Sequence, residues 1–372
     1  MRSVLHELPA ASAGTLRRLR SLHFGAATSG RKAYLQAALH ADEVPPMLVA
    51  QCLIERLSAL EEAGAIAGEI VLVPMANPIG LAQDVQGSAF GRFDLGTGIN
   101  FNRQFRHLTP ALIPALQGCL GADAAANTRA VRAACLSLLG AWRPASEAEA
   151  LKRLLQTLAA DADLVLDLHC DNQAVVHVYT GTPQVQALRP LAGYLGAQAL
   201  LHSAVSGDDP FDETLSRTWW ELAEHFQGRH PIDPHGCLAA TVELRGETEV
   251  SQDLAERDAD ALVAALRLLG HVSGQTTPAP AGCEPTPLEG VEPVTAPVSG
   301  IVVFAKAPGD WVEAGELVAE IVCPLTDART PLRARTTGRC FARTARRFAT
   351  RGMRLAKIAG AVAYRTGALL SP

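Results

Sequence analysis

Residues 33–46 read Ala-Tyr-Leu-Gln-Ala-Ala-Leu-His-Ala-Asp-Glu-Val-Pro-Pro and join a short apolar run to an amphipathic segment. The run over residues 33–39 has the length of a buried strand, and residues 46–63 follow with the spacing of a helix. Prolines at this junction suit the first turn of a helix, because the backbone N–H groups of that turn lack partners inside the helix. A strand that leads directly into a helix indicates an α/β unit.

The same alternation continues toward the C-terminus. Further apolar runs that predict buried strands are residues 70–76, 163–168, 175–179 and 239–244. Further helical patterns occupy residues 124–139, 146–159, 210–226 and 251–269. Strands separated by helices predict an α/β fold with a mostly parallel mixed sheet flanked by helices. Ligands of such sheets bind at the carboxyl ends of the strands.

The composition changes after residue 272. Residues 273–295 are rich in Pro, Gly and Thr without periodicity, so we expect a linker or domain boundary there. Residues 296–372 contain short strand-like runs and a weak internal repeat, whose two copies begin near Gly300 and Gly338. This pattern predicts a small all-β barrel or sandwich, whereas residues 1–272 form the α/β domain.

Composition and charge exclude several functions. The chain has 372 residues, 48% of them hydrophobic, and its 33 Lys and Arg against 38 Asp and Glu give a net charge of −5. The chain has no excess of positive charge to neutralise a phosphate backbone, so we expect no nucleic-acid partner. No apolar run approaches the roughly 18 residues of a membrane helix, and the N-terminus lacks the apolar core of a signal peptide. We therefore expect a cytoplasmic protein without a membrane partner.

The first candidate site pairs His40 with Glu43 after the first predicted strand. A tight turn or helix start can direct both side chains at one point, and imidazole nitrogen and carboxylate oxygen are ligands of Zn²⁺. Alone, the spacing is more often a helix N-terminal carboxylate beside a hydrogen-bonded histidine.

The predicted strand over residues 163–168 ends at His169, where an α/β sheet would place a third ligand. Alone, this histidine is more often a satisfied polar group. Together, His40, Glu43 and His169 form a two-histidine, one-carboxylate set with an open position, which is typical of catalytic zinc. Asp167 is a candidate partner that orients a ligand, although a role buried in the sheet is equally frequent.

Glu243 lies in the apolar strand Thr-Val-Glu-Leu-Arg, residues 241–245. A buried glutamate is costly unless it is paired. Near a metal-bound water it could act as a general base, and the alternative is a salt bridge to Arg245.

Residues 91–106 carry Arg92 and Arg103 in a glycine-rich segment that also contains Asn102. Arginine binds carboxylates with two parallel hydrogen bonds, so this loop could hold an anionic substrate, and a solvated turn is the alternative. Residues 206–214 could line the substrate pocket, but a loop followed by a capped helix is the more frequent reading, and we assign none of them to the site.

These signals together resemble the succinylglutamate desuccinylase/aspartoacylase family, which is related to zinc carboxypeptidases. The resemblance covers most of residues 20–270, and its motifs occur in the family's order. They are Ala37-Ala-Leu-His40-Ala-Asp-Glu43, Val73-Pro-Met-Ala-Asn77-Pro78, Asn102-Arg103, Asp167-Leu-His169 and Thr241-Val-Glu243-Leu. The resemblance implies a zinc-carboxypeptidase-like fold and a catalytic role for residues 1–272.

The family's functional residues map onto this chain one by one. One Zn²⁺ per chain is implied, with the ligands His40, Glu43 and His169. Glu243 is implied as the general base and acid, and Arg92 as the arginine that polarises the scissile carbonyl. Asn102 and Arg103 match the pair that binds a substrate carboxylate.

The implied activity is hydrolysis of the amide bond of a small-molecule N-acylated amino acid. Two alternatives stay open, a metallocarboxypeptidase acting on peptides and a non-catalytic, metal-free binding protein, and so does a homo-oligomeric state.

The C-terminal part resembles a biotinyl/lipoyl-like barrel, on the evidence of Ala296-Pro-Val-Ser-Gly300 and Pro308-Gly-Asp-Trp-Val-Glu-Ala-Gly315. A carrier domain of this type has a lysine at its central hairpin, and residues 323–330 contain none. We therefore expect no attached biotin or lipoyl group. The domain would instead shape the mouth of the active site or an oligomer contact.

Overall fold

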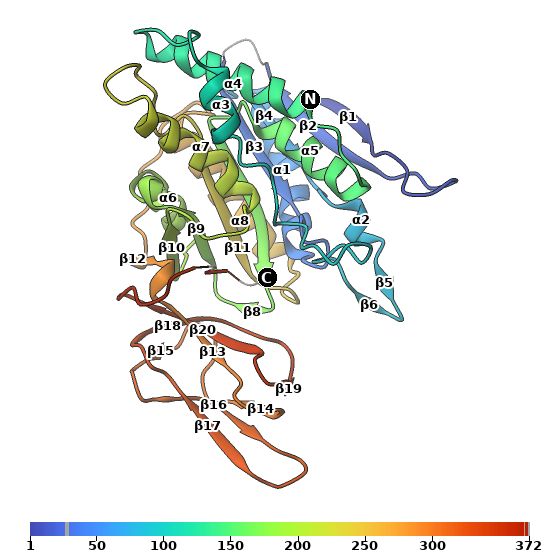
Figure 1. Cartoon of the computed structure of the whole chain (residues 1–372), viewed down its shortest axis with the longest axis vertical. Helices are drawn as coiled ribbons and strands as arrows, with labels where there is room; N and C mark the ends of the chain where they lie inside the picture. The colour runs from blue at the N-terminus through green and yellow to red at the C-terminus, as the bar shows by residue number, and fades with distance from the viewer. Residues whose placement is uncertain (27–29, 368, 371–372) are drawn as a thin grey trace.

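A computed structural model describes residues 1–26, 30–367 and 369–370. Figure 1 shows a layered α/β unit and, below it, a unit of strands coloured orange to red. The main sheet has nine strands in the order β1 (Arg2–Glu7), β2 (Arg18–Gly25), β4 (Glu69–Val73), β3 (Lys32–Ala37), β7 (Leu164–Asp171), β11 (Leu238–Gly246), β9 (His177–Gly181), β10 (Ala199–Ser203) and β12 (Pro285–Pro287). Strands β4, β3, β7 and β11 are parallel to one another, while β1 with β2, β2 with β4 and β9 with β11 pair antiparallel. The predicted α/β fold with a large mixed sheet is confirmed.

Helices cover both faces of this sheet, as Figure 1 shows. One face packs against α1 (Pro45–Glu62), α6 (Val185–Tyr194) and α8 (Gln252–Leu268). The other packs against α3 (Thr109–Ala115), α4 (Ala124–Ala141), α5 (Glu147–Ala159) and α7 (Phe211–His225). Alternation along a strand explains the two cores, because Leu35 of β3 points into the first and its neighbour Tyr34 into the second. None of the helices within the described ranges is long and apolar enough to cross a membrane.

Local sequence sets where several helices begin. The Ser146 side chain accepts a hydrogen bond from the backbone N–H of Glu149 at 3.1 Å, which caps α5. The Glu149 carboxylate accepts one in return from the backbone N–H of Ala145, close to a capping box. Pro45 and Pro46 occupy the first turn of α1, where the missing N–H groups cost nothing.

Several element ends differ from the predicted ones. Strand β3 stops at Ala37 because Ala38 turns into a left-handed conformation, φ +58°, and β4 stops before Pro74, which cannot donate a ladder hydrogen bond. The strand predicted over residues 175–179 begins later, as β9 from His177 to Gly181, and the short strand β8 (Gln173–Ala174) precedes the predicted run. Strands β1, β2 and β10 and helix α6 were not predicted.

The strands after residue 290 repeat one plan twice. One sheet has the order β13 (Val291–Thr295), β20 (Arg354–Gly360), β18 (Gly338–Arg343), β15 (Trp311–Val312), and the other has β17 (Arg329–Arg333), β16 (Leu317–Val322), β14 (Gly300–Phe304), β19 (Phe348–Ala349). The sequence repeat aligns each strand of the first sheet with one of the second, in the same order. Both copies contribute to one apolar core. Strands β12 and β13 lie within the predicted boundary segment 273–295.

This β-unit contacts the strand that carries His169. Strand β8, which directly follows β7, hydrogen-bonds to β18, and Ala174 packs near Phe341 in a shared apolar cluster. The ammonium group of Lys357, on β20, forms an ion pair with Asp171 at the end of β7. Two independent contacts therefore connect the β-unit to the carboxyl end of the central strand.

We expect Lys357→Met to destabilise the full chain by roughly 1–3 kcal/mol, because Asp171 would keep a largely buried charge without its partner. Urea unfolding monitored by circular dichroism measures the change. The matched control is Arg329→Met, since Arg329 pairs with Glu320 on the exposed surface of the β-unit and its loss should matter less. Equal effects of the two variants would contradict the prediction.

Candidate active site

The turn between β3 and α1 positions His40 and Glu43. The left-handed Ala38 redirects the chain at the strand end, and the backbone N–H of Ala41 donates to the carbonyl oxygen of Gly91 at 3.1 Å. Gly91 has to be a glycine here, since a Cβ atom at this position would lie 2.1 Å from the backbone nitrogen of Asp42. The glycine-rich loop thus packs directly on the turn that carries the two side chains.

His40, Glu43 and His169 converge on one point, and all three side chains are buried. One ligand atom from each lies within 4.8 Å of those of the other two. The two carboxylate oxygens of Glu43 face one ring nitrogen each, Oε1 at 2.8 Å from Nδ1 of His40 and Oε2 at 2.7 Å from Nδ1 of His169. The structure therefore brings together the three residues predicted as ligands.

The outer ring nitrogens of both histidines meet fixed acceptors. Nε2 of His40 lies 2.7 Å from Oδ1 of Asn100, and Nε2 of His169 lies 3.0 Å from Oδ2 of Asp167. If these outer nitrogens carry the ring protons, both Nδ1 lone pairs face the Glu43 carboxylate, so that acceptors surround a single point. Such a set is stable around a cation, and outer acceptors of this kind orient histidines that bind metals. Burial lowers the pKa of His40 to about 4, whereas the Asp167 and Glu43 carboxylates outweigh burial and raise the pKa of His169. A bound cation would favour the neutral form of both rings.

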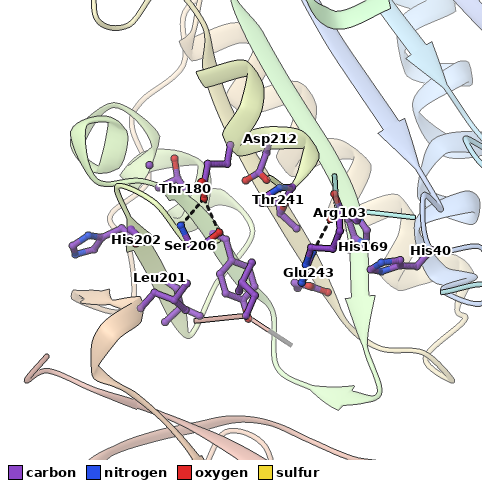
Figure 2. A pocket seen from close by; sticks show the side chains of 18 of the residues that line it. His40, Arg103, His169, Thr180, Leu201, His202, Ser206, Asp212, Thr241 and Glu243 are labelled. Carbon is purple, nitrogen blue, oxygen red and sulfur yellow. Dashed lines mark hydrogen bonds between the residues drawn. The ribbon is translucent and has the colours of Figure 1, made fainter. Parts of the chain in front are cut away.

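Glu243 lies opposite His169 in the parallel pairing of β11 and β7 and lines the same pocket. Its Oε2 atom is buried and has no hydrogen-bond partner among the residues that the structure describes. Burial, with the nearby charge of Glu43, raises the pKa of Glu243 to about 8. Figure 2 shows this carboxylate next to His169, on the side of the pocket where His40 also lies.

The remaining predicted residues line the pocket as well. Nη1 of Arg92 lies 3.3 Å from both Nδ1 of His40 and Oε1 of Glu43. The Asn102 side chain accepts a hydrogen bond from the backbone N–H of Phe211 at 2.9 Å, and Nη1 of Arg103 donates to the Asn102 carbonyl oxygen at 2.7 Å.

Other lining residues were not assigned from the sequence. They include Tyr179, Ser206, Asp212, Thr241 and Lys357. Ser206 and Asp212 belong to the segment that the sequence marks as a possible pocket wall. Lys357 belongs to β20 of the β-unit, so no local sequence pattern indicates that it lines this pocket.

Comparison with known proteins decides the family. Residues 29–269 match the model of the succinylglutamate desuccinylase/aspartoacylase catalytic domain. The chain belongs to the succinylglutamate desuccinylase/aspartoacylase family. The predicted family resemblance is thereby confirmed for the catalytic part, and members of this family are hydrolases.

Several solved structures share the fold along nearly the whole chain. A family protein from Shewanella amazonensis is 25% identical, with a TM-score of 0.84 and coverage of 96% of this chain and 98% of that one. One from Shewanella frigidimarina is 24% identical, with a TM-score of 0.85 and coverage of 96% and 97%. The product-bound ectoine utilization protein EutE (DoeB) from Ruegeria pomeroyi is 18% identical, with a TM-score of 0.66 and coverage of 96% and 95%. No curated protein matches the sequence significantly.

Proposed function

We propose that this protein is a zinc-dependent hydrolase that cleaves the amide bond of N-acyl amino acids or similar small molecules. The observation that carries the proposal is the convergence of His40, Glu43 and His169 beside the unpaired carboxylate oxygen of Glu243. Membership of a hydrolase family supports it. A site for one cation and an adjacent base are the two parts that metal-assisted amide hydrolysis needs.

Two nitrogen donors and one carboxylate suit Zn²⁺ in a catalytic site, which keeps one position open. When bound, zinc would act as a Lewis acid and make hydroxide available near neutral pH. The chain's own contribution is to bury the three ligands and to fix both rings through Asn100 and Asp167.

A cation held by the three ligands would favour the ionised form of Glu243, which then takes the proton of the attacking water at its unpaired Oε2 atom. Glu243 next delivers that proton to the leaving nitrogen, which makes a good leaving group of the amine. Among the described residues that line the pocket, Glu243 is the acid that pairs with His169 in the register of β11 and β7.

Arg92 and Arg103 interact with negative charge on the substrate. Arg92 lies next to the ligand set and stabilises the carbonyl oxygen as charge develops on it. Arg103, with Asn102, holds a substrate carboxylate through its planar group, which orients the scissile bond.

The test is a panel of N-acyl amino acids and short peptides, each incubated with the purified protein while free amine is assayed. We expect release from the N-acyl amino acids, and elemental analysis should give one zinc per chain. Release only from peptides would establish the carboxypeptidase alternative. A protein that binds no metal under any condition would be the non-catalytic alternative.

We expect Asp167→Asn to weaken zinc binding by roughly 10- to 100-fold, because the amide replaces the charged acceptor beside His169. Competition with a coloured chelator measures the affinity. Asp161→Asn is the control, since Asp161 lies in the turn before β7, away from His169, and pairs with Lys32. Unchanged zinc affinity in Asp167→Asn would contradict the orienting role.

A further inference from the structure

One wall of the pocket carries an acid that the proposed reaction does not use. Asp212 is the second residue of α7, is only 8% exposed, and lines the pocket. The backbone N–H of Glu213 interacts with its carboxylate, but no described side chain donates a hydrogen bond to it. In the view of Figure 2, Asp212 and Thr241 lie between Ser206 and Thr180 on one side and Glu243 and His169 on the other.

The neighbouring acid Glu213 is different, because the chain itself hydrogen-bonds one of its two carboxylate oxygens. Its Oε2 accepts hydrogen bonds from the backbone N–H and the hydroxyl of Ser206, at 2.8 and 2.6 Å, and Arg217 lies 3.6 Å from its Oε1. Glu213 therefore holds the loop before α7 in place. Asp212 has no such internal role.

The cations near Asp212 have other partners. Arg103 lines the same pocket and is acted on by the Asp212 charge, but its Nη1 atom donates to the Asn102 carbonyl oxygen. Lys357 is engaged by Asp171, and Arg217 is shared among acids on the outer side of α7. Burial, with Asp167 and Glu213 nearby, raises the pKa of Asp212 to about 7, and burial lowers the pKa of His202. A buried carboxylate is costly unless it is paired, and a positively charged group from outside would supply the pair.

Asp212 lines the same pocket as Glu243 and Arg103, the two residues proposed to contact the amide and the carboxylate of an amino-acid substrate. Thr241 and Glu243 are two residues apart on the same face of β11, a distance of roughly 7 Å. Arg103 lines the same pocket, and the charge of Asp212 acts on it. A substrate whose carboxylate contacts Arg103 and whose amide lies at Glu243 would therefore direct its side chain along the wall that Asp212 forms.

We propose that Asp212 determines specificity by binding an ammonium group on the side chain of the substrate, so that the preferred substrates are N-acylated diamino acids. The substrate class rests on the proposed amide hydrolysis. The binding of the diamino acid itself rests on Asp212 and the pocket alone.

The kinetic test compares the Nα-acetyl and Nα-succinyl derivatives of ornithine, norvaline and glutamate. Norvaline has the same carbon chain as ornithine and lacks only the ammonium group. We expect kcat/KM for ornithine to exceed that for norvaline by roughly 10- to 100-fold, as a charge-assisted hydrogen bond provides. Asp212→Asn should abolish this ratio mainly through KM. The matched control Asp209→Asn, an exposed neighbour outside the pocket lining, should keep it.

The binding test uses calorimetry with free ornithine, norvaline and glutamate, and it does not depend on turnover. We expect ornithine to bind at least about tenfold more tightly than the other two, and Asp212→Asn to remove the difference. Tighter binding of glutamate, or an ornithine preference that survives in Asp212→Asn, would overturn the inference. Selective ornithine binding without hydrolysis of any derivative would uphold Asp212 and refute the proposed hydrolysis instead.

Discussion

Replacing Glu243 with glutamine will lower kcat by roughly 10²- to 10⁴-fold while the protein keeps its fold and its metal. Glutamine has the same shape but cannot take up the proton of the attacking water or deliver it to the leaving amine. The unpaired Oε2 atom shows that the native carboxylate is not needed for an internal hydrogen bond, so the change should not unfold the site.

Steady-state kinetics with the best substrate of the panel measures this loss, and elemental analysis verifies the metal content. Glu247→Gln is the control, because Glu247 lies just beyond the same strand and accepts a hydrogen bond from Asn172 outside the pocket lining. Near-normal turnover in Glu243→Gln, with contaminating enzyme excluded, would refute the assigned base.

Replacing His169 with alanine will remove bound zinc and lower activity to background. The variant leaves two ligands, and the Glu43 carboxylate loses the ring nitrogen that lies 2.7 Å from its Oε2. A catalytic zinc site depends on three protein ligands, so we expect the metal content to fall to roughly a tenth or less after dialysis.

His202→Ala is the control for a histidine in the same pocket. Its ring contacts the hydroxyl of Thr182 at 3.0 Å, so that zinc content should remain at the native level. Full zinc occupancy in His169→Ala, in a folded protein, would show that the three-residue set is not the metal site.

The ligand set can be predicted because the ends of the strands are recognisable in the sequence. His169 follows an apolar strand, and His40 and Glu43 follow another, so parallel packing alone places them at one edge of the sheet. Most helices were also predicted, since their apolar spacing and start signals, such as Ser146 before α5, agree.

The parts that escaped prediction depend on contacts distant in the sequence. Asp212 in the first turn of α7 looks like an ordinary acid at a helix start, and only the folded pocket shows that no side chain of the described residues hydrogen-bonds to it. Lys357 meets Asp171 across 186 positions, and no local pattern announces that pair. The antiparallel strands β1 and β2 at one side of the main sheet alternate polar and apolar side chains too weakly to be distinguished from loops.

The pairing of β8 with β18 has an evolutionary consequence. A recombination event that exchanged the C-terminal unit between two relatives would have to preserve this strand pairing and the partner of Asp171 at once. Selection should therefore keep the two parts as a co-inherited pair, so that substitutions around β8 are compensated by substitutions in β18 and β20. Chimaeric proteins assembled at residue 290 are expected to lose activity unless β8 and the strands β18 and β20 come from the same parent.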